Sequence, residues 1–222
     1  MSTPAAPRRA LVAGATGLIG RELMQLLAQD PACSALHVLS RRPLTLAAPR
    51  AQVLVVDYAT LAALPAVDDV YIALGTTIKV AGSQAAFHAV DFDAVLAVAR
   101  LARESGATRL GVVSAMGADA RSRLFYNRVK GEMESAVQQL GYASVTIARP
   151  SFLAGDRASL GQPPRFGEGA ALAAFHVLAP VIPARLRAIR ADVVARALHR
   201  QLHSGAPGVQ VLLSDALQRL GR

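Results

Sequence analysis

The chain has 222 residues, of which 53% are hydrophobic, so it is long enough to form one domain with a full hydrophobic core. Its single cysteine, Cys33, excludes an internal disulfide framework and is typical of a reducing compartment, for which we expect the cytoplasm. The formal net charge is +9, but the basic residues are scattered and not interleaved with aromatic residues, so the charge does not predict nucleic-acid binding.

Short apolar runs alternate with longer helical patterns, which is typical of βαβ units and a parallel sheet. The predicted strands are Ala10–Ala13, Leu36–Leu39, Val53–Val56, Val70–Leu74, Leu110–Ser114, Val145–Ala148 and Val209–Leu213. The predicted helices are Gly20–Gln29, Ser83–Glu104, Ser122–Leu140 and Asp192–His203. The pattern predicts an α/β fold of the Rossmann type, a doubly wound parallel sheet, in a single domain over residues 1–222.

Residues 10–150 are expected to form the core of this domain, and residues 151–222 a smaller part on the substrate side. The segment 151–187 has no clear period and is rich in glycine and proline. Within it, residues 170–184 are apolar but too short to span a bilayer and interrupted by Pro180 and Pro183, so we expect no stable membrane insertion. We interpret this run as core, with a lid or a dimer surface as alternatives.

A glycine-rich turn, Gly14-Ala15-Thr16-Gly17-Leu18-Ile19-Gly20, directly follows the first predicted strand and opens a helix. Glycines at this spacing permit a tight turn, a close approach of the backbone to a pyrophosphate, and close helix–strand packing. The pyrophosphate then lies at the helix N-terminus, where free N–H groups favour an anion. The turn in this context predicts a dinucleotide-binding site.

The end of the second strand indicates which dinucleotide binds. An NAD site usually has an acidic residue about 20 residues after the turn. This chain has Ser40-Arg41-Arg42 there, and two guanidinium groups can pair with a 2′-phosphate, although both arginines could also be solvated loop residues. The sequence therefore predicts NADP(H) in preference to NAD(H).

Two more strand ends belong to the same edge of the predicted sheet. Asp57 and Tyr58 follow the third strand and are candidates to flank an adenine. Leu74, Gly75, Thr76 and Thr77 follow the fourth strand, where small residues let a cofactor lie close. Either group can also be ordinary turn chemistry.

A catalytic group is predicted at the fifth strand and the helix that follows it. Ser114 ends the strand, and Tyr126 and Lys130 are four residues apart, so they share one helix face. A free tyrosine has a pKa of about 10, and a nearby lysine cation favours the phenolate needed for acid–base work near neutral pH. Ser114 would orient a substrate oxygen, and Lys130 would also bind the nicotinamide ribose.

These motifs resemble those of the short-chain dehydrogenase/reductase superfamily, in its atypical or extended branch. The glycine turn and the set Ser114, Tyr126 and Lys130 carry this resemblance. The chain is also similar to a narrower group, the bacterial relatives of the human oxidoreductase called HIV Tat-interactive protein 2. That likeness rests on Ser40-Arg41-Arg42-Pro43, Leu74-Gly75-Thr76-Thr77, Phe87 to Asp93, Val129-Lys130-Gly131-Glu132 and Arg149-Pro150 through Asp156-Arg157.

The resemblance implies NADPH binding, with Arg149 and Pro150 also at the cofactor site, and hydride transfer with Tyr126 as general acid/base. Many family members have an asparagine in the helix before the fifth strand, as part of a proton relay. This chain has Val90-Asp91-Phe92-Asp93 there, and Asp91 is the candidate substitute. Some relatives are epimerases or dehydratases that act on nucleotide sugars, and the C-terminal part of this chain is short for such a substrate.

The predicted function is an NADPH-dependent oxidoreductase acting on a small carbonyl or alcohol. The alternatives are a regulatory or sensor protein that binds NADPH with little turnover, and an epimerase or dehydratase. A small-molecule substrate is expected, and a homodimer is one possible assembly. We expect no metal, because His199 and His203, four apart on a predicted helix, have no evident third ligand.

Overall fold

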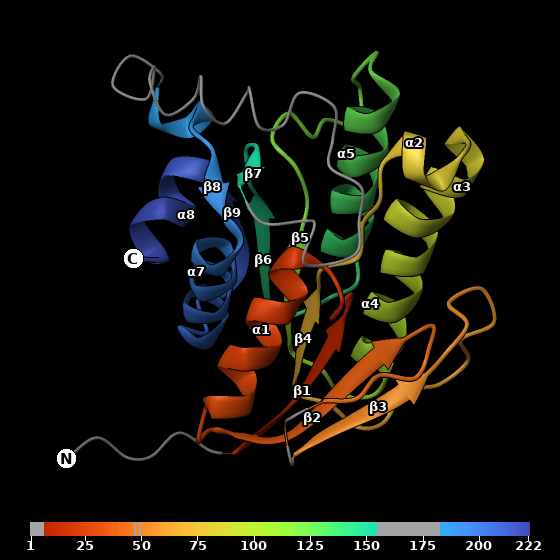
Figure 1. The fold of residues 1–222 in the computed structure, drawn as a ribbon, viewed down its shortest axis with the longest axis vertical. Coiled ribbons are helices and arrows are strands. Elements are labelled where there is room, and N and C mark those ends of the chain that lie inside the picture. Colours follow the sequence, from red (N-terminus) through yellow and green to blue (C-terminus); the bar gives the residue numbers. More distant parts are fainter. Residues whose placement is uncertain (1–6, 47, 49, 155–182) are drawn as a thin grey trace.

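Seven strands form the central sheet of the computed structural model, which describes residues 7–46, 48, 50–154 and 183–222 (Figure 1). Every neighbouring pair is parallel, and the strand order is β3-β2-β1-β4-β5-β6-β9. The strands are β1 (Arg8–Ala13), β2 (Cys33–Ser40), β3 (Ala51–Val55), β4 (Asp69–Ile72), β5 (Arg109–Val113), β6 (Ser144–Arg149) and β9 (Gly208–Leu213). The order reverses between β1 and β4, where such sheets bind their ligands, and the predicted Rossmann-type fold is confirmed.

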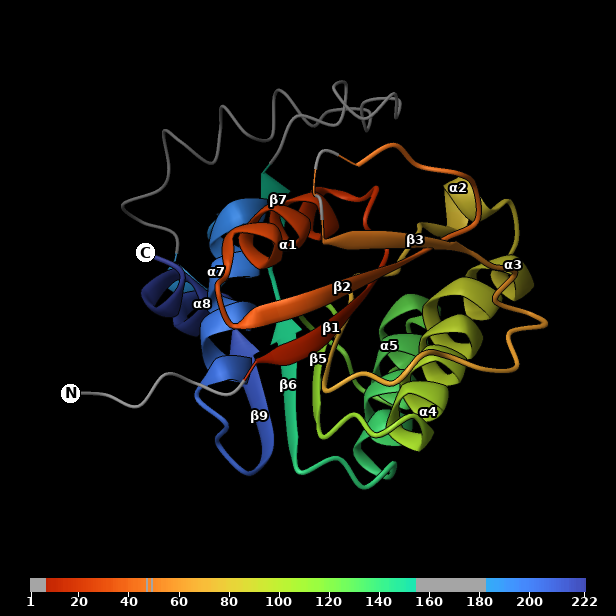
Figure 2. The same ribbon diagram turned by 90° about the horizontal axis from the view of Figure 1, so that it is seen from below.

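Helices cover both faces of the sheet, as Figure 2 shows. On one face lie α1 (Leu18–Gln29), α7 (Ala191–His203) and α8 (Ser214–Leu220), and on the other α4 (Val95–Glu104) and α5 (Phe125–Gln138). In β1, Ala10 and Val12 pack toward the first group, and Leu11 and Ala13 toward the second. Burial on both faces explains why this strand is a continuous apolar run rather than an alternating one.

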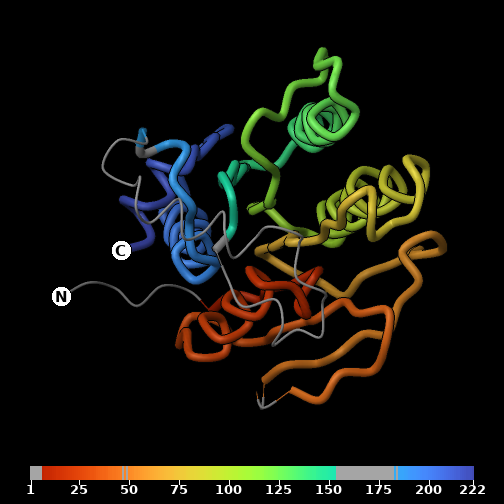
Figure 3. The backbone as a smooth tube through the Cα atoms, turned by 45° about the horizontal axis from the view of Figure 1, so that its top comes forward, coloured from red at the N-terminus to blue at the C-terminus, as the bar shows by residue number. Residues whose placement is uncertain are grey.

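Helices α1 and α7 lie side by side although they come from opposite ends of the chain (Figure 3). Leu23 and Leu27 of α1 belong to the same buried cluster as Val194 and Leu198 of α7. Helix α1 packs on β1 and β2, and α7 packs on β5 and β6, on the same face of the sheet. Residues near the C-terminal ends of these helices are thereby neighbours in space.

The segment between β4 and β5 differs from the expected single helix over residues 83–104. It is divided into α2 (Ile78–Ala81), α3 (Gln84–His88), a π-helical turn η1 (Ala89–Ala94) and α4. A π-turn is wider than an α-turn and is frequently found at functional sites. Here it places Asp91 in the interior, where the side chain is 0% exposed.

Smaller differences lie at the ends of elements. The second strand begins earlier than Leu36, so that Cys33 is the first residue of β2 and is buried. No pattern in the sequence predicts α8, the 3-10 turn η3 (Ala184–Leu186) or the two-stranded sheet of β7 (Leu153–Ala154) and β8 (Ile189–Arg190). All of these are short, and short elements carry little periodic signal.

Residues 155–182, which are most of the segment 151–187, lie outside the described residues, and with them the apolar run up to Ile182. Among the helices of the described ranges, none combines the length and the apolar character that crossing a membrane requires.

Candidate active site

The glycine-rich turn holds the start of α1 close to the end of β4. Gly14 has a φ of +92°, and a Cβ atom there would lie 2.5 Å from the carbonyl carbon and oxygen of Ala73. A Cβ atom on Gly20 would overlap the carbonyl oxygen of Gly14. These two glycines are therefore required by the packing of the protein itself.

Gly17 differs from its two neighbours. It is the N-cap residue of α1, with a φ of −79° that any residue adopts, and the nearest atom to an added Cβ is Gly14 O, at 3.4 Å. No side chain caps this helix, and no acidic residue stands in its first turn. The first-turn N–H groups, at the positive end of the helix, are therefore left for an anion.

The remaining residues of the turn mostly face the protein. Ala15 and Ile19 are buried, and Leu18 packs against the same cluster. Thr16 is exposed at the tip of the turn. The turn thus offers mainly backbone groups, rather than side chains, to a ligand.

The end of β2 presents the two predicted arginines to solvent. The hydroxyl of Ser40 accepts a hydrogen bond from the backbone N–H of Arg42 at 3.2 Å. Arg41 and Arg42 are exposed, and in the ranges that the structure describes neither forms an ion pair with a carboxylate. Both guanidinium groups are therefore available to an anion.

Tyr58, three residues after β3, lies near the charge of Arg41. Its hydroxyl donates a hydrogen bond to the carbonyl oxygen of Leu39 at 3.3 Å. Burial raises the pKa of Tyr58 to about 12, with a smaller opposite effect from the Arg41 charge. Asp57 is exposed and accepts a hydrogen bond from the N–H of Ala59 at 3.0 Å, which is ordinary turn chemistry.

A buried ion pair lies where the loop after β4, η1 and α5 meet. Lys130 Nζ is 2.7 Å from Asp91 Oδ1, and the two side chains are 4% and 0% exposed. The other carboxylate oxygen of Asp91 accepts a hydrogen bond from the N–H of Thr76 at 2.9 Å. The pair therefore fixes the predicted catalytic lysine and the loop after β4 in one arrangement.

The loop after β4 is shaped around this pair. A Cβ atom on Gly75 would lie 3.4 Å from Asp91 Oδ1 and 3.9 Å from Lys130 Nζ. Thr77 caps α2 by accepting a hydrogen bond from Val80 N at 3.1 Å, and Leu74 packs on the core. The sequence analysis identifies Asp91 only as a candidate substitute for an asparagine. The signal for its buried ion pair is a carboxylate in the middle of an apolar helical segment.

Ser114 and Tyr126 occupy the positions the sequence suggests, one just after β5 and one in the first turn of α5. Ser114 is 5% exposed, and its hydroxyl has no hydrogen-bond partner in the parts of the chain that the structure describes. The ring of Tyr126 is half-buried and packs on Phe87, with 5.4 Å between ring centroids. An unpartnered buried hydroxyl is unfavourable unless a ligand supplies the partner.

Arg149 and Pro150, at the end of β6, make protein contacts. The guanidinium of Arg149 pairs with the buried carboxylate of Glu134 on α5, with Nη2 and Oε2 2.5 Å apart, and this contact raises the pKa of Arg149. The carbonyl oxygen of the buried Pro150 accepts a hydrogen bond from Met116 N at 3.0 Å. Both residues tie β6 to the elements that carry Ser114 and Tyr126.

A second polar group lies at the opposite, amino end of the strands. Asp30, the C-cap residue of α1, faces His199 and His203 of α7. The expectation that these histidines have no third potential ligand nearby is therefore wrong. Burial is the main cause that lowers the pKa of His199 to about 4, with a further contribution from His203. Burial also lowers the pKa of His203, partly offset by Asp30.

A family model described as NAD(P)H-binding matches residues 14–168, from the first glycine of the turn into the segment after β7. The mitochondrial protein FMP52 of Eremothecium gossypii is 36% identical over 151 residues, 67% of either chain. Protein fmp52 of Emericella nidulans, also named mitochondrial, is 34% identical over 154 residues, 65% of this chain and 66% of that one. The chain thus spans about two thirds of the length of these relatives.

These relatives correct one expectation. Their names place them in mitochondria, so the cytoplasmic location expected from the sequence is wrong. The physical reason is that one unpaired cysteine indicates a reducing environment and does not distinguish one reducing compartment from another.

Solved structures with a similar fold include MoeE5 in complex with UDP-glucose and NAD. It superposes with a TM-score of 0.69 at 17% identity, over 92% of this chain and 75% of that one. A UDP-N-acetylglucosamine 4-epimerase from Methanobrevibacter ruminantium gives a TM-score of 0.66 at 14% identity, over 94% of this chain and 77% of that one. At these identities the likeness establishes the fold.

Proposed function

Because the chain belongs to the NAD(P)H-binding family, we propose that it is an NADPH-dependent oxidoreductase of the short-chain dehydrogenase/reductase type, acting on a carbonyl compound or the corresponding alcohol. The observation that carries the proposal is the buried hydroxyl of Ser114, which has no partner among the described residues and follows the strand that precedes the helix of Tyr126 and Lys130. We keep the likeness to relatives of HIV Tat-interactive protein 2 as part of the proposal, since two of the motifs that carry it contain Asp91 and Lys130.

The residues present fit a bound dinucleotide. The uncapped N-terminus of α1 offers N–H groups to a pyrophosphate, and Gly17 leaves open the space that a Cβ would fill. When bound, the cofactor supplies the hydride, that is, the two electrons of the reaction. The crossover point of the sheet, between β1 and β4, puts this turn next to the loop that contacts Lys130.

The side chains divide the remaining work. Ser114 donates its free O–H to the substrate carbonyl oxygen and orients it. Tyr126 gives its hydroxyl proton to that oxygen as the carbonyl carbon is reduced, and takes a proton from solvent afterwards. Lys130 holds positive charge near this hydroxyl, and Asp91 holds Lys130 in place while balancing part of its charge.

Replacement of Tyr126 by phenylalanine tests the proposal. We expect kcat for reduction of a panel of aldehydes and ketones to fall by at least about 100-fold, because the proton donor is lost. The Kd for NADPH is expected to change little. Tyr142→Phe is the matched control, since that hydroxyl donates to the carbonyl oxygen of Ala99 in the core; its activity should remain.

Three outcomes contradict the proposal. Equal rates for wild type and Tyr126→Phe would remove the tyrosine from the mechanism. NADPH binding without turnover on any carbonyl would favour a regulatory protein. Turnover without a net change in nicotinamide absorbance would favour an epimerase or dehydratase.

The preference for NADPH is tested at Arg41 and Arg42. Replacing both by serine removes the charge-assisted hydrogen bonds to a 2′-phosphate, and at this solvent-exposed position we expect a net loss of about 1.5–3 kcal/mol for the two together. We expect the Kd for NADPH to rise roughly 10- to 100-fold while that for NADH stays constant, as measured by fluorescence titration. Arg100→Ser, at an exposed position on α4, is the control and should leave the ratio unchanged. An unchanged ratio in the double variant would refute the assignment.

A further inference from the structure

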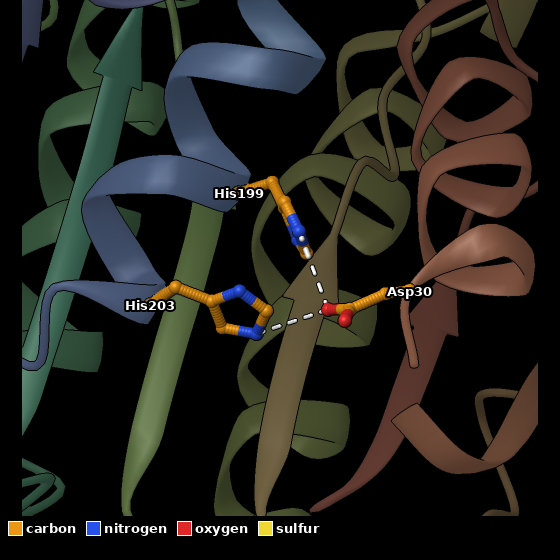
Figure 4. Close-up of side chains that lie close together, drawn as sticks. All are labelled: Asp30, His199 and His203. Carbon is orange, nitrogen blue, oxygen red and sulfur yellow. Dashed lines mark ion pairs between the residues drawn. The ribbon is translucent and has the colours of Figure 1, made fainter. Parts of the chain in front are cut away.

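Three side chains converge at the amino edge of the sheet, at the end remote from the glycine turn. Figure 4 shows Asp30, at the end of α1, pointing toward His199 and His203, one helical turn apart on α7. One potential ligand atom from each residue lies within 4.8 Å of the other two. The Nε2 atoms of His199 and His203 are 3.5 Å and 3.6 Å from Asp30 Oδ2.

These distances fit a shared ion better than direct hydrogen bonds. A good N–H···O bond joins heavy atoms about 2.7–3.2 Å apart. Among the residues that the structure describes, no group donates a hydrogen bond to Asp30 Oδ2, although it is buried. Ligand atoms about 2.1 Å from a tetrahedral ion are about 3.4 Å from each other, close to the two separations in this cluster.

In Asp30 and His199, the second polar atom of the side chain, which would not bind the ion, already has a hydrogen-bond partner. Asp30 Oδ1 accepts one from the N–H of Ala32 at 2.8 Å, which turns Oδ2 toward the histidines. His199 Nδ1 lies 3.2 Å from the buried hydroxyl of Tyr71 on β4. With its proton on Nδ1 donated to Tyr71, the ring presents the Nε2 lone pair, as metal-binding histidines commonly do.

Charge and ligand type limit the choice of ion. Arg8 and Arg109 lie near the cluster and share the carboxylate of Asp69, at 2.8 Å and 2.7 Å, so these three groups carry one net positive charge, which the carboxylate of Asp30 offsets. Two imidazoles and one carboxylate suit Zn²⁺ and related transition-metal ions, whereas Mg²⁺ and Ca²⁺ prefer oxygen ligands.

We propose that Asp30, His199 and His203 bind one Zn²⁺ ion, which links the end of α1 to the last two turns of α7. The side chain of His203 is 30% exposed, so water reaches the open fourth position. The site lies at the amino ends of the strands, away from Ser114 and Tyr126, and we assign it a structural role. It does not depend on the proposed reaction.

The first test is calorimetric titration of the metal-free chain with Zn²⁺ near neutral pH. We expect one ion per chain and a rise in Tm that a chelator reverses. Asp30→Asn and His203→Gln should each weaken Zn²⁺ binding at least 100-fold, and Tyr71→Phe about tenfold through loss of the Nδ1 partner. His88→Gln is the matched control, because that exposed histidine lies 3.2 Å from Asp93 with no second imidazole in the described cluster.

Substitution by Co²⁺ is the second measurement, and it uses the intact chain. A tetrahedral site gives intense visible absorption bands, which should appear at one equivalent and disappear when Zn²⁺ is added. NADPH affinity should be the same with and without Zn²⁺. The proposal is overturned if the wild type binds no Zn²⁺, if Asp30→Asn and His203→Gln retain full affinity, or if His88→Gln is the variant that loses it.

Discussion

Replacing Asp91 by alanine is expected to lower the free energy of unfolding by about 3–5 kcal/mol, measured by urea denaturation. The substitution leaves the ammonium group of Lys130 buried, at 4% exposure, without its counter-charge. It also removes the acceptor of the Thr76 N–H. An uncompensated buried charge is among the few single-residue changes with so large an effect.

A double variant separates the charge from the packing. In Asp91→Ala combined with Lys130→Met, the isolated charge is gone, and we expect a smaller loss of stability than in Asp91→Ala alone. Glu104→Ala is the control, because its pair with Arg100 is more than half exposed on both sides and should contribute less than about 1 kcal/mol. If Asp91→Ala were as mild as Glu104→Ala, the buried pair would not fix the site.

Gly14→Ala is expected to cause the second large loss of stability, with a free energy of unfolding close to zero. A left-handed backbone costs a residue with a Cβ about 1–2 kcal/mol. In addition, the new methyl group would lie 2.5 Å from backbone atoms of Ala73, which directly follows β4 and is held by the hydrogen bond that its N–H donates to the carbonyl oxygen of Ala13 at 2.8 Å. Overpacking of this kind typically adds about 1–3 kcal/mol or more.

Gly82→Ala isolates the contribution of the backbone angle. Gly82 also has a positive φ, +87°, but a Cβ there would meet no atom of the described residues within 4 Å. We expect Gly82→Ala to cost about 1–2 kcal/mol in thermal or urea unfolding, and Gly14→Ala at least about 3 kcal/mol. Equal losses of stability in the two variants would mean that a methyl group at residue 14 does not clash with the backbone after β4.

Much of the fold follows from the sequence because apolar periodicity directly reports burial. The continuous run Ala10–Ala13 predicts a strand covered on both faces, and both faces are covered. The predicted helix end at Glu104 is also the end of α4, and Gly106 follows it with a φ of +103°. Ser114 lies at its expected strand end because strand ends are set by local pattern.

The interactions that carry the chemistry depend on tertiary contacts. The π-turn of η1 adds no signal to the hydrophobic pattern, so the approach of Asp91 to Lys130 cannot be seen in the sequence. The spacing of His199 and His203 is visible, but Asp30 joins them only because α1 and α7 pack side by side on the same face of the sheet. A third potential ligand this far away in sequence has no local signature.

The most direct test of the account is a titration of NADPH into wild type and into Gly17→Ala. Among the described residues, a methyl group at residue 17 meets no atom closer than 3.4 Å, so the free energy of unfolding should change by no more than about 1 kcal/mol. The same methyl group would occupy the space next to the backbone that a pyrophosphate needs. We predict saturable binding of NADPH to wild type and an affinity at least tenfold lower in Gly17→Ala. Equal affinities, or no binding to wild type, would contradict the assignment of this turn as the cofactor site.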